Sequence, residues 1–340
     1  RHPPVPALPR SPIRISLGSE AFVIACYKTS PEGTFPLEAP EPGCWVSIVA
    51  PTLEERAWLR DELGVLPEFV QSVLDDEESS HVDFDDDAHQ TLIIIDCPFI
   101  EDAHEAEDAS IVQYDTHPLS ILFLQKRDIL VTVSLKPNDT IRALETGRIK
   151  QVNTKHSTRL ILKIMLNIMQ RYLGYLRNID RQFNSTERVL RETMRNAELI
   201  KMLALEKSLV YFSTSLKGAE STLAKISSGR YIRLYEDDRD LLDDVLIEMR
   251  QAIEMCTIYT SILNGTMDTF SSVINNNLNF TMRTLTTITL LLAVPTIIFS
   301  FYGMNVPDLP IVGSWYLPIG LSVLVCVLLG IFFKKSRFFK

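Results

Sequence analysis

Two long uncharged segments stand at the C-terminal end of the chain. No charged residue occurs in the 24 residues from 284 to 307 or in the 25 from 309 to 333, and only Asp308 separates them. A membrane-spanning helix needs about 20 apolar residues, so each segment is long enough to cross a bilayer. A buried hairpin in a soluble core is the alternative, but soluble helices rarely run this far without a charge. The pattern predicts a first transmembrane helix at 284–302, an outer loop at 303–314 and a second transmembrane helix at 315–333.

Basic residues flank the predicted spans on one side only. Arg283 precedes the first span, the tail 334–340 holds four Lys or Arg residues, and the connecting loop holds none. Because cytoplasmic flanks carry the excess of Lys and Arg, both termini are expected in the cytoplasm. The sequence thus predicts a multi-pass protein of the cell (inner) membrane.

Short apolar runs and helical runs alternate over residues 13–137, which we predict to form a cytosolic α/β domain. Thr52 followed by Glu55 is a capping-box pattern for a helix at 52–63. A second helix is expected at 67–74. The strand-like runs are 22–27, 45–49, 91–96, 120–124 and 128–134. The proline-rich residues 1–12 are expected to be a disordered tail or a remnant of cloning.

The pattern becomes helical over residues 138–283. No proline occurs between Pro137 and Pro295, and apolar residues recur at helical spacing. Helices are expected at about 155–195 and 199–226, followed by a third that starts near Asp237 and continues into the first span. So long a helix is not stable alone in water and must pack against other helices or copies of itself. A coiled-coil tether is the alternative interpretation of this region.

Charge is divided unevenly along the chain. Residues 1–115 hold 24 Asp and Glu against 6 Lys and Arg, whereas the whole chain has a net charge of −9. Such an acidic head disfavours nucleic acid as a partner and favours cations. The five cysteines contain no C-x-x-C pair, and no phosphate-binding loop or nucleophile motif is present, so neither an enzyme nor a nucleotide-binding protein is indicated.

The segment Tyr302-Gly303-Met304-Asn305 lies at the expected outer end of the first span. With two C-terminal spans, a preceding long helix and a basic tail, it resembles the signature of the CorA family of magnesium transporters. The resemblance implies an α+β membrane protein that assembles as a homopentameric channel, in which five first spans line the pore. Rings of Gly303, Met304 and Asn305 would meet a hydrated Mg²⁺ ion at the outer entrance, where neutral oxygens hold its waters without removing them. A plain helix C-cap is the alternative role for Gly303.

Helical spacing counted back from Asn305 predicts which residues line the pore. Met282 and Leu285 would form a hydrophobic constriction, and the small polar residues would accept hydrogen bonds from the ion's waters. The alternative is that the threonines satisfy backbone carbonyls or pack helices. The predicted stripe is Asn279, Met282, Leu285, Thr289, Ala293, Thr296 and Ser300.

Two clusters of carboxylates are candidate regulatory sites for cytosolic Mg²⁺, which prefers oxygen ligands. One has eight acids between Asp75 and Asp87, and the other begins the third helix. The resemblance to the family implies that Asp244 and Asp268 act as sensors on the stalk, with Asp240 and Asp243 beside them. The family's acidic pair in the head is Gln71-Ser72 here, so Asp75 or Asp76 is the expected substitute. A solvated acidic face is the alternative.

The sequence therefore predicts passive, potential-driven uptake of divalent cations, chiefly Mg²⁺ and also Co²⁺ or Ni²⁺, gated by cytosolic Mg²⁺. Expected partners are other copies of the chain, lipid and divalent cations. A zinc transporter of the related ZntB type has the same architecture, and a membrane-tethered scaffold without transport is the rival from another class. The intact Gly303-Met304-Asn305 segment favours magnesium.

Overall fold

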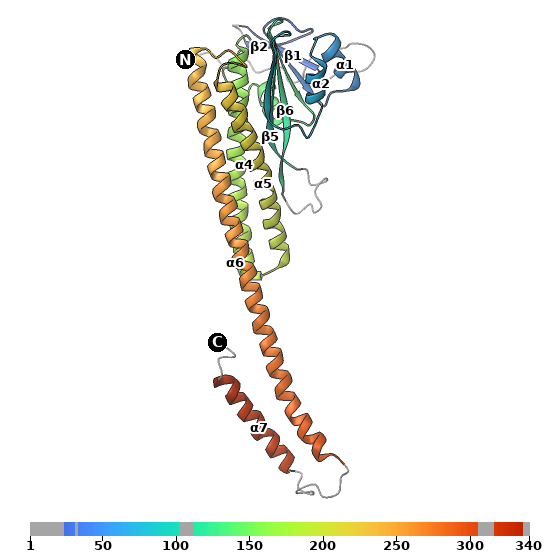
Figure 1. The fold of residues 1–340 in the computed structure, drawn as a ribbon, viewed down its shortest axis with the longest axis vertical. Helices are drawn as coiled ribbons and strands as arrows, with labels where there is room; N and C mark the ends of the chain where they lie inside the picture. Colours follow the sequence, from blue (N-terminus) through green and yellow to red (C-terminus); the bar gives the residue numbers. More distant parts are fainter. Residues whose placement is uncertain (1–23, 31–32, 102–111, 305–315, 336–340) are drawn as a thin grey trace. The chain divides into compact units, whose positions relative to one another are not determined.

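The computed structural model describes residues 24–30, 33–101, 112–304 and 316–335, shown as a ribbon in Figure 1. They fall into two compact units, one ending at Asn264 and the other beginning at Gly265. The predicted tail 1–12 and the signature residue Asn305 lie outside the described residues.

A seven-stranded mixed sheet forms the centre of the first unit, in the order β2-β1-β3-β7-β6-β5-β4. Only the β3–β7 pair is parallel among the described pairings. The strands are β1 (Ile24–Ser30), β2 (Gly33–Leu37), β3 (Cys44–Val49), β4 (His81–Asp85), β5 (Gln90–Ile100), β6 (Tyr114–Leu124) and β7 (Ile129–Ser134).

Helices cover both faces of this sheet (Figure 1). The short helices α1 (Leu53–Asp61) and α2 (Pro67–Val73) share a core with Leu92 and Ile94 of β5. The alternate residues of that strand, among them Ile93, are equally buried on the opposite face, because successive side chains of a strand point to opposite sides.

The predicted capping box is confirmed at the start of α1. The side chain of Thr52 accepts a hydrogen bond from the backbone of Glu55, and the Glu55 carboxylate accepts one from the Thr52 backbone at 2.7 Å. Glu55 is fully buried, so this carboxylate fixes the entry of the helix from inside the fold.

Two long helices, α4 (Ser157–Thr193) and α5 (Asn196–Ser227), pack on the other side of the sheet, and the first part of α6 (Glu236–Tyr302) contacts α5. The Tyr172 hydroxyl of α4 donates to the backbone carbonyl of Asp96 at 3.0 Å, and the Ser208 hydroxyl of α5 accepts from the Tyr114 backbone at 2.9 Å. The thiol of Cys256 in α6 donates to the Leu209 carbonyl of α5 at 3.2 Å. These buried polar contacts fix the helices against the sheet and against each other.

Strands β2 and β4 and the short helix α3 (Asp139–Glu145) were not among the predicted elements. Both strands lie at sheet edges, and β4 falls inside the acidic run. Strand β4 carries two acids and β2 contains Pro36, which sheets tolerate at their edges, so neither has the apolar pattern of a buried strand.

His117 is a buried link between β6 and α3. The side-chain oxygen of Asn138 accepts from the backbones of Thr140 and Ile141 at the start of α3. The Asn138 amide nitrogen therefore donates to His117 Nε2, 3.2 Å away, which places the proton of the neutral ring on Nδ1. Burial, aided by the positive charge of Lys136, lowers the pKa of His117 from 6.5 to about 4.

We expect His117 to make the stability of the first unit depend on pH. Between pH 6.5 and about 4 the unfolded chain binds a proton at this histidine that the folded chain excludes. The free energy of unfolding should therefore decrease by roughly 3 kcal/mol as the pH is lowered from 6.5 to about 4. Urea unfolding of the full-length protein in detergent, followed by tryptophan fluorescence, measures the slope.

The variant His117→Gln should flatten this part of the pH profile, because Gln does not titrate. His156→Gln, at an exposed position, is the matched control and should retain the wild-type slope. Parallel profiles for wild type and His117→Gln would contradict the assignment.

Candidate ion pathway

The C-terminal part of α6 and the helix α7 (Tyr316–Lys335) are long and apolar enough to cross a membrane. In the most apolar window of each helix, only 6% and 11% of the residues are buried inside the structure. A core helix of a soluble protein would be mostly buried. The exposed apolar surface thus argues against the soluble-hairpin alternative, because such surface needs a non-aqueous environment or a partner.

Within the second unit, α7 contacts α6 at a proline. Pro295 has no backbone N–H, so it cannot bond the carbonyl of Leu291 four residues earlier. The thiol of Cys326 in α7 donates to that Leu291 carbonyl at 3.6 Å. A neighbouring helix thereby supplies a partner for the group that the proline leaves free, as expected for backbone in a water-free environment.

The face of α6 with reduced exposure follows helical spacing. Thr287 is buried, and Leu291, Val294 and Ile298 are half-buried. The predicted pore stripe lies on roughly the opposite side of the helix, at 3.6 residues per turn. Of its seven residues, six are exposed and Ala293 is half-buried, so this unit leaves the stripe available to face other copies of the chain.

Threonine hydroxyls of the first span donate to the carbonyl four residues earlier in the same helix. Thr289 bonds Leu285 at 2.9 Å and Thr296 bonds Leu292 at 3.0 Å, as Thr286 does with Met282 off the stripe. A hydroxyl that donates in this way keeps oxygen lone pairs free to accept. The backbone role proposed as the alternative and a pore role are therefore compatible for Thr289 and Thr296.

Helix α6 ends at Tyr302, immediately before the signature. The Gly303 N–H closes the last turn on the Phe299 carbonyl at 2.9 Å, and Met304 is 52% exposed. A Cβ on Gly303 would lie 3.1 Å from that same carbonyl, closer than nine in ten real Cβ contacts. Gly303 keeps a negative φ, so it is close packing at the helix end, rather than a left-handed turn, that favours glycine here.

The predicted regulatory acids are distributed over separate elements. Asp240, Asp243, Asp244 and Asp268 are exposed on α6, whereas Asp75 and Asp76 lie in the turn after α2. The Asp75 carboxylate accepts a hydrogen bond from the Glu77 backbone at 3.0 Å. No cluster of three potential metal ligands occurs among the described residues, and the role of these acids stays a prediction.

The Cys326–Leu291 contact was not among the predictions from the sequence. Pro295, inside an otherwise regular span, is the sequence feature that indicates it. A proline lacks a backbone N–H, so the carbonyl four residues earlier has no helical donor. The identity of the donor, however, depends on how α7 packs, and a uniformly apolar helix gives no periodicity from which to infer that.

The structure combines an α/β unit, a long helix and two C-terminal helical segments that are long and apolar enough to cross a membrane. A family model described as "CorA-like Mg2+ transporter protein" matches residues 41–335. The chain therefore belongs to the CorA-like family of Mg²⁺ transporter proteins, as the signature predicted.

Two relatives are each named "Cobalt/magnesium transport protein CorA". That of Methanocaldococcus jannaschii is 26% identical over 304 residues, 86% of this chain and 90% of the relative. That of Thermotoga maritima is 21% identical and covers 55% of this chain and 54% of the relative.

Solved structures extend the comparison to the fold. The complete CorA magnesium transporter of M. jannaschii superposes with a TM-score of 0.77 at 25% identity, covering 94% of this chain and 99% of that one. Full-length CmaX superposes at 0.69 and 16% identity, covering 92% and 97%. The ZntB cytoplasmic domain of Vibrio parahaemolyticus superposes with a TM-score of 0.58 at 16% identity, covering 75% of this chain and 98% of that one, so proteins with different names share this fold.

The predicted hydrophobic constriction at Leu285 can be tested by substitution. In proteoliposomes, Leu285→Thr should raise basal Mg²⁺ flux severalfold, because a polar ring stays wet and no longer blocks ions. Leu290→Thr is the matched control, since Leu290 is also exposed but lies about 140° further round the helix. Equal basal flux in both variants and wild type, at matched protein density, would place the constriction elsewhere.

Proposed function

We propose that this chain is one subunit of a homopentameric channel for passive entry of hydrated divalent cations, chiefly Mg²⁺. The observation that carries the proposal is the end of the first apolar helix at Tyr302, directly followed by Gly303, Met304 and Asn305. Family membership over residues 41–335 and the CorA fold support it.

The chemistry of the proposed pore suits an ion that keeps its water. Mg²⁺ dehydrates reluctantly, and its waters present hydrogens outward. Neutral acceptors, such as the hydroxyl oxygens of Thr289 and Thr296, bind those hydrogens without removing water from the ion. Uncharged side chains line the whole predicted stripe, which permits passage rather than trapping.

The membrane potential is sufficient as the driving force. An inside-negative potential favours entry of one charge by about 2.3 kcal/mol per 100 mV, hence twice that for a divalent ion. No step of this transport needs a nucleotide or a covalent intermediate, which agrees with a transporter rather than an enzyme.

The proposal also names the transported ion, for which Mg²⁺, Co²⁺ and Zn²⁺ are the candidates. The CorA relatives carry cobalt and magnesium in their names, which favours these two ions. The likeness to the ZntB domain shows a shared fold and leaves zinc as the second candidate. Proteoliposome uptake of Mg²⁺, Co²⁺ and Zn²⁺ under one imposed potential tests the choice. Faster Zn²⁺ than Mg²⁺ uptake would favour the ZntB-type function, and no uptake of any ion would favour the scaffold.

Asn305 should be essential at the entrance. Asn305→Ala removes a ring of side-chain oxygens that hold the hydrated ion, so Mg²⁺ uptake should fall at least tenfold while the oligomer keeps its size on gel filtration. Asn276→Ala makes the same change on exposed α6 surface outside the stripe and should transport normally. A folded Asn305→Ala oligomer with normal uptake would refute the entrance.

We further propose that internal Mg²⁺ closes the channel by bridging acids of neighbouring subunits. Asp240, Asp243, Asp244 and Asp268 are exposed on α6, the helix that continues into the first span. When the ion leaves, carboxylates that face each other repel, which loosens the assembly. A ligand shifts such an equilibrium only through different affinity for the two states, so removal of ligands should weaken inhibition.

Currents measured against internal Mg²⁺ test this mechanism. Asp244→Ala should shift half-inhibition to a severalfold higher Mg²⁺ concentration, and the combined Asp240/Asp243/Asp244/Asp268→Ala variant should shift it further. Glu254→Ala, an exposed acid of α6 outside the predicted set, should match wild type. Coincident curves for all four proteins would leave the stalk acids as a solvated face only.

A further inference from the structure

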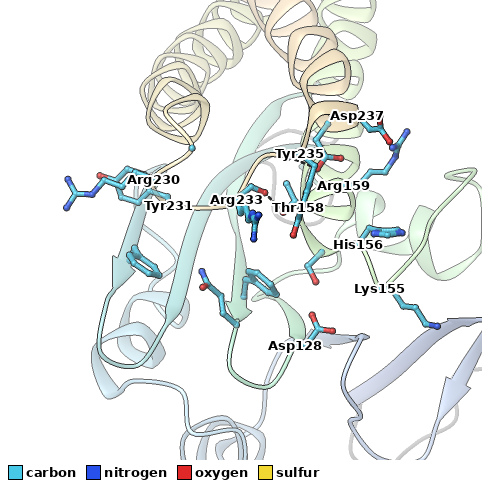
Figure 2. A pocket seen from close by; sticks show the side chains of 16 residues that line it. Asp128, Lys155, His156, Thr158, Arg159, Arg230, Tyr231, Arg233, Tyr235 and Asp237 are labelled. Carbon is cyan, nitrogen blue, oxygen red and sulfur yellow. Dashed lines mark hydrogen bonds between the residues drawn. The ribbon is translucent and has the colours of Figure 1, made fainter.

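A cavity of about 720 Å³ lies in the first unit, where the sheet, the start of α4 and the connection from α5 to α6 meet (Figure 2). Its walls include the five consecutive residues 155–159, the connection at 229–235 and the aromatic residues Phe84 and Phe123. The volume falls within the range of small-molecule sites in proteins.

The start of α4 presents unsatisfied donors to this cavity. The preceding residue, His156, gives α4 no side-chain cap. The backbone N–H groups of Ser157, Thr158 and Arg159 have no partner among the described residues, whereas the next one, of Leu160, bonds the His156 carbonyl at 2.9 Å. Free N–H groups and the helix dipole make such a terminus a site for anions.

Ser157 is an independent sign that a ligand belongs here. Its side chain lines the cavity, is only 6% exposed, and leaves Oγ buried with no hydrogen-bond partner among the described residues. A buried hydroxyl without a partner is costly, and native proteins seldom keep one unless something binds it.

Basic side chains also line this cavity. Four line the cavity, Lys155, Arg159, Arg230 and Arg233, and none forms an ion pair among the described residues. In Figure 2, Arg233 lies near the middle of the view beside Thr158, while Lys155 and Arg230 extend to opposite sides.

Three acids also line the cavity, and two of them belong to the start of α6. Asp238 is buried and accepts a hydrogen bond from the Tyr235 backbone at 3.4 Å, while Asp237 lies in the first turn. Acids at this position interact favourably with the dipole of their own helix. Only Asp128 stands apart from a helix start, so the wall at α4 keeps its positive character.

Aromatic rings complete the cavity. Phe84, Phe123, Tyr231 and Tyr235 line it, and the Arg233 guanidinium lies 5.3 Å from the Tyr235 ring centre. A planar base has faces to stack on such rings, whereas inorganic phosphate has none. We propose that the cavity binds a nucleoside triphosphate, with its phosphates at the start of α4 and its base among the aromatic side chains.

The position of the cavity gives this binding a route to the long helix. Thr158 Oγ1 donates to the Arg233 carbonyl at 3.0 Å, which joins the start of α4 to the connection that leads into α6. An occupant that contacts both walls would hold the start of α6 in place. The site lies entirely in the unit that ends at Asn264, so it does not depend on the proposed transport activity.

Binding of ATP to the full-length protein in detergent, measured by calorimetry, tests the proposal. ATP should bind, and the double variant Arg159→Gln/Arg233→Gln should weaken binding at least tenfold through loss of two phosphate partners. Arg188→Gln, an exposed position far along α4, is the matched control and should bind like wild type. Ser157→Ala removes only the buried hydroxyl and should weaken binding severalfold with the charge unchanged.

Two ligand controls define the occupant. Adenosine should bind at least tenfold more weakly than ATP because it lacks phosphates, and inorganic triphosphate should do so because it lacks the base. Absence of ATP binding, or equal affinity in the double variant and Arg188→Gln, would overturn the site. Equal affinity for ATP and inorganic triphosphate would overturn the nucleoside assignment.

Discussion

The structure depends on keeping backbone hydrogen bonds intact where water cannot replace them. An α-helix satisfies its backbone internally, which is why helices span bilayers and irregular segments do not. Helix α6 keeps its backbone helical from Glu236 to Tyr302. At its single proline, Pro295, the thiol of Cys326 in α7 donates to the Leu291 carbonyl that the proline leaves free. Because α6 runs without interruption between these ends, the regulatory and pore residues proposed here lie on the same helix.

In the first unit, the constraint is burial of apolar surface, and the first part of α6 takes part in it. The sheet of this unit is buried on both faces, so the helices on one side must cover apolar strands as well as each other. Hydrogen bonds such as Tyr172 to Asp96 and Cys256 to Leu209 tie α4 to the sheet and α6 to α5. A ligand at the start of α4 would therefore act on an assembly that is already connected by buried polar contacts.

The sequence predicted the parts of the fold that have a strong pattern. The long helices, the apolar spans and the capping box at Thr52 followed from periodicity and spacing, and the signature identified the family. Strand β4 was hidden because its alternating acids resemble a solvated run. The pore stripe remains a prediction, since the side of a helix that faces another copy depends on assembly. The cavity at Ser157 could not be predicted, because it joins residues of four elements that no linear motif connects.

The contact between Cys326 and Leu291 bears on how the chain enters a membrane. Without α7, the first span would enter hydrocarbon with the Leu291 carbonyl deprived of its usual donor by Pro295. The thiol of Cys326, a weak donor, reduces that cost once the second span lies beside the first. The two spans are thus better suited to partition into lipid together as a hairpin than one after the other, and the short segment between them keeps the second span close enough for this during biosynthesis.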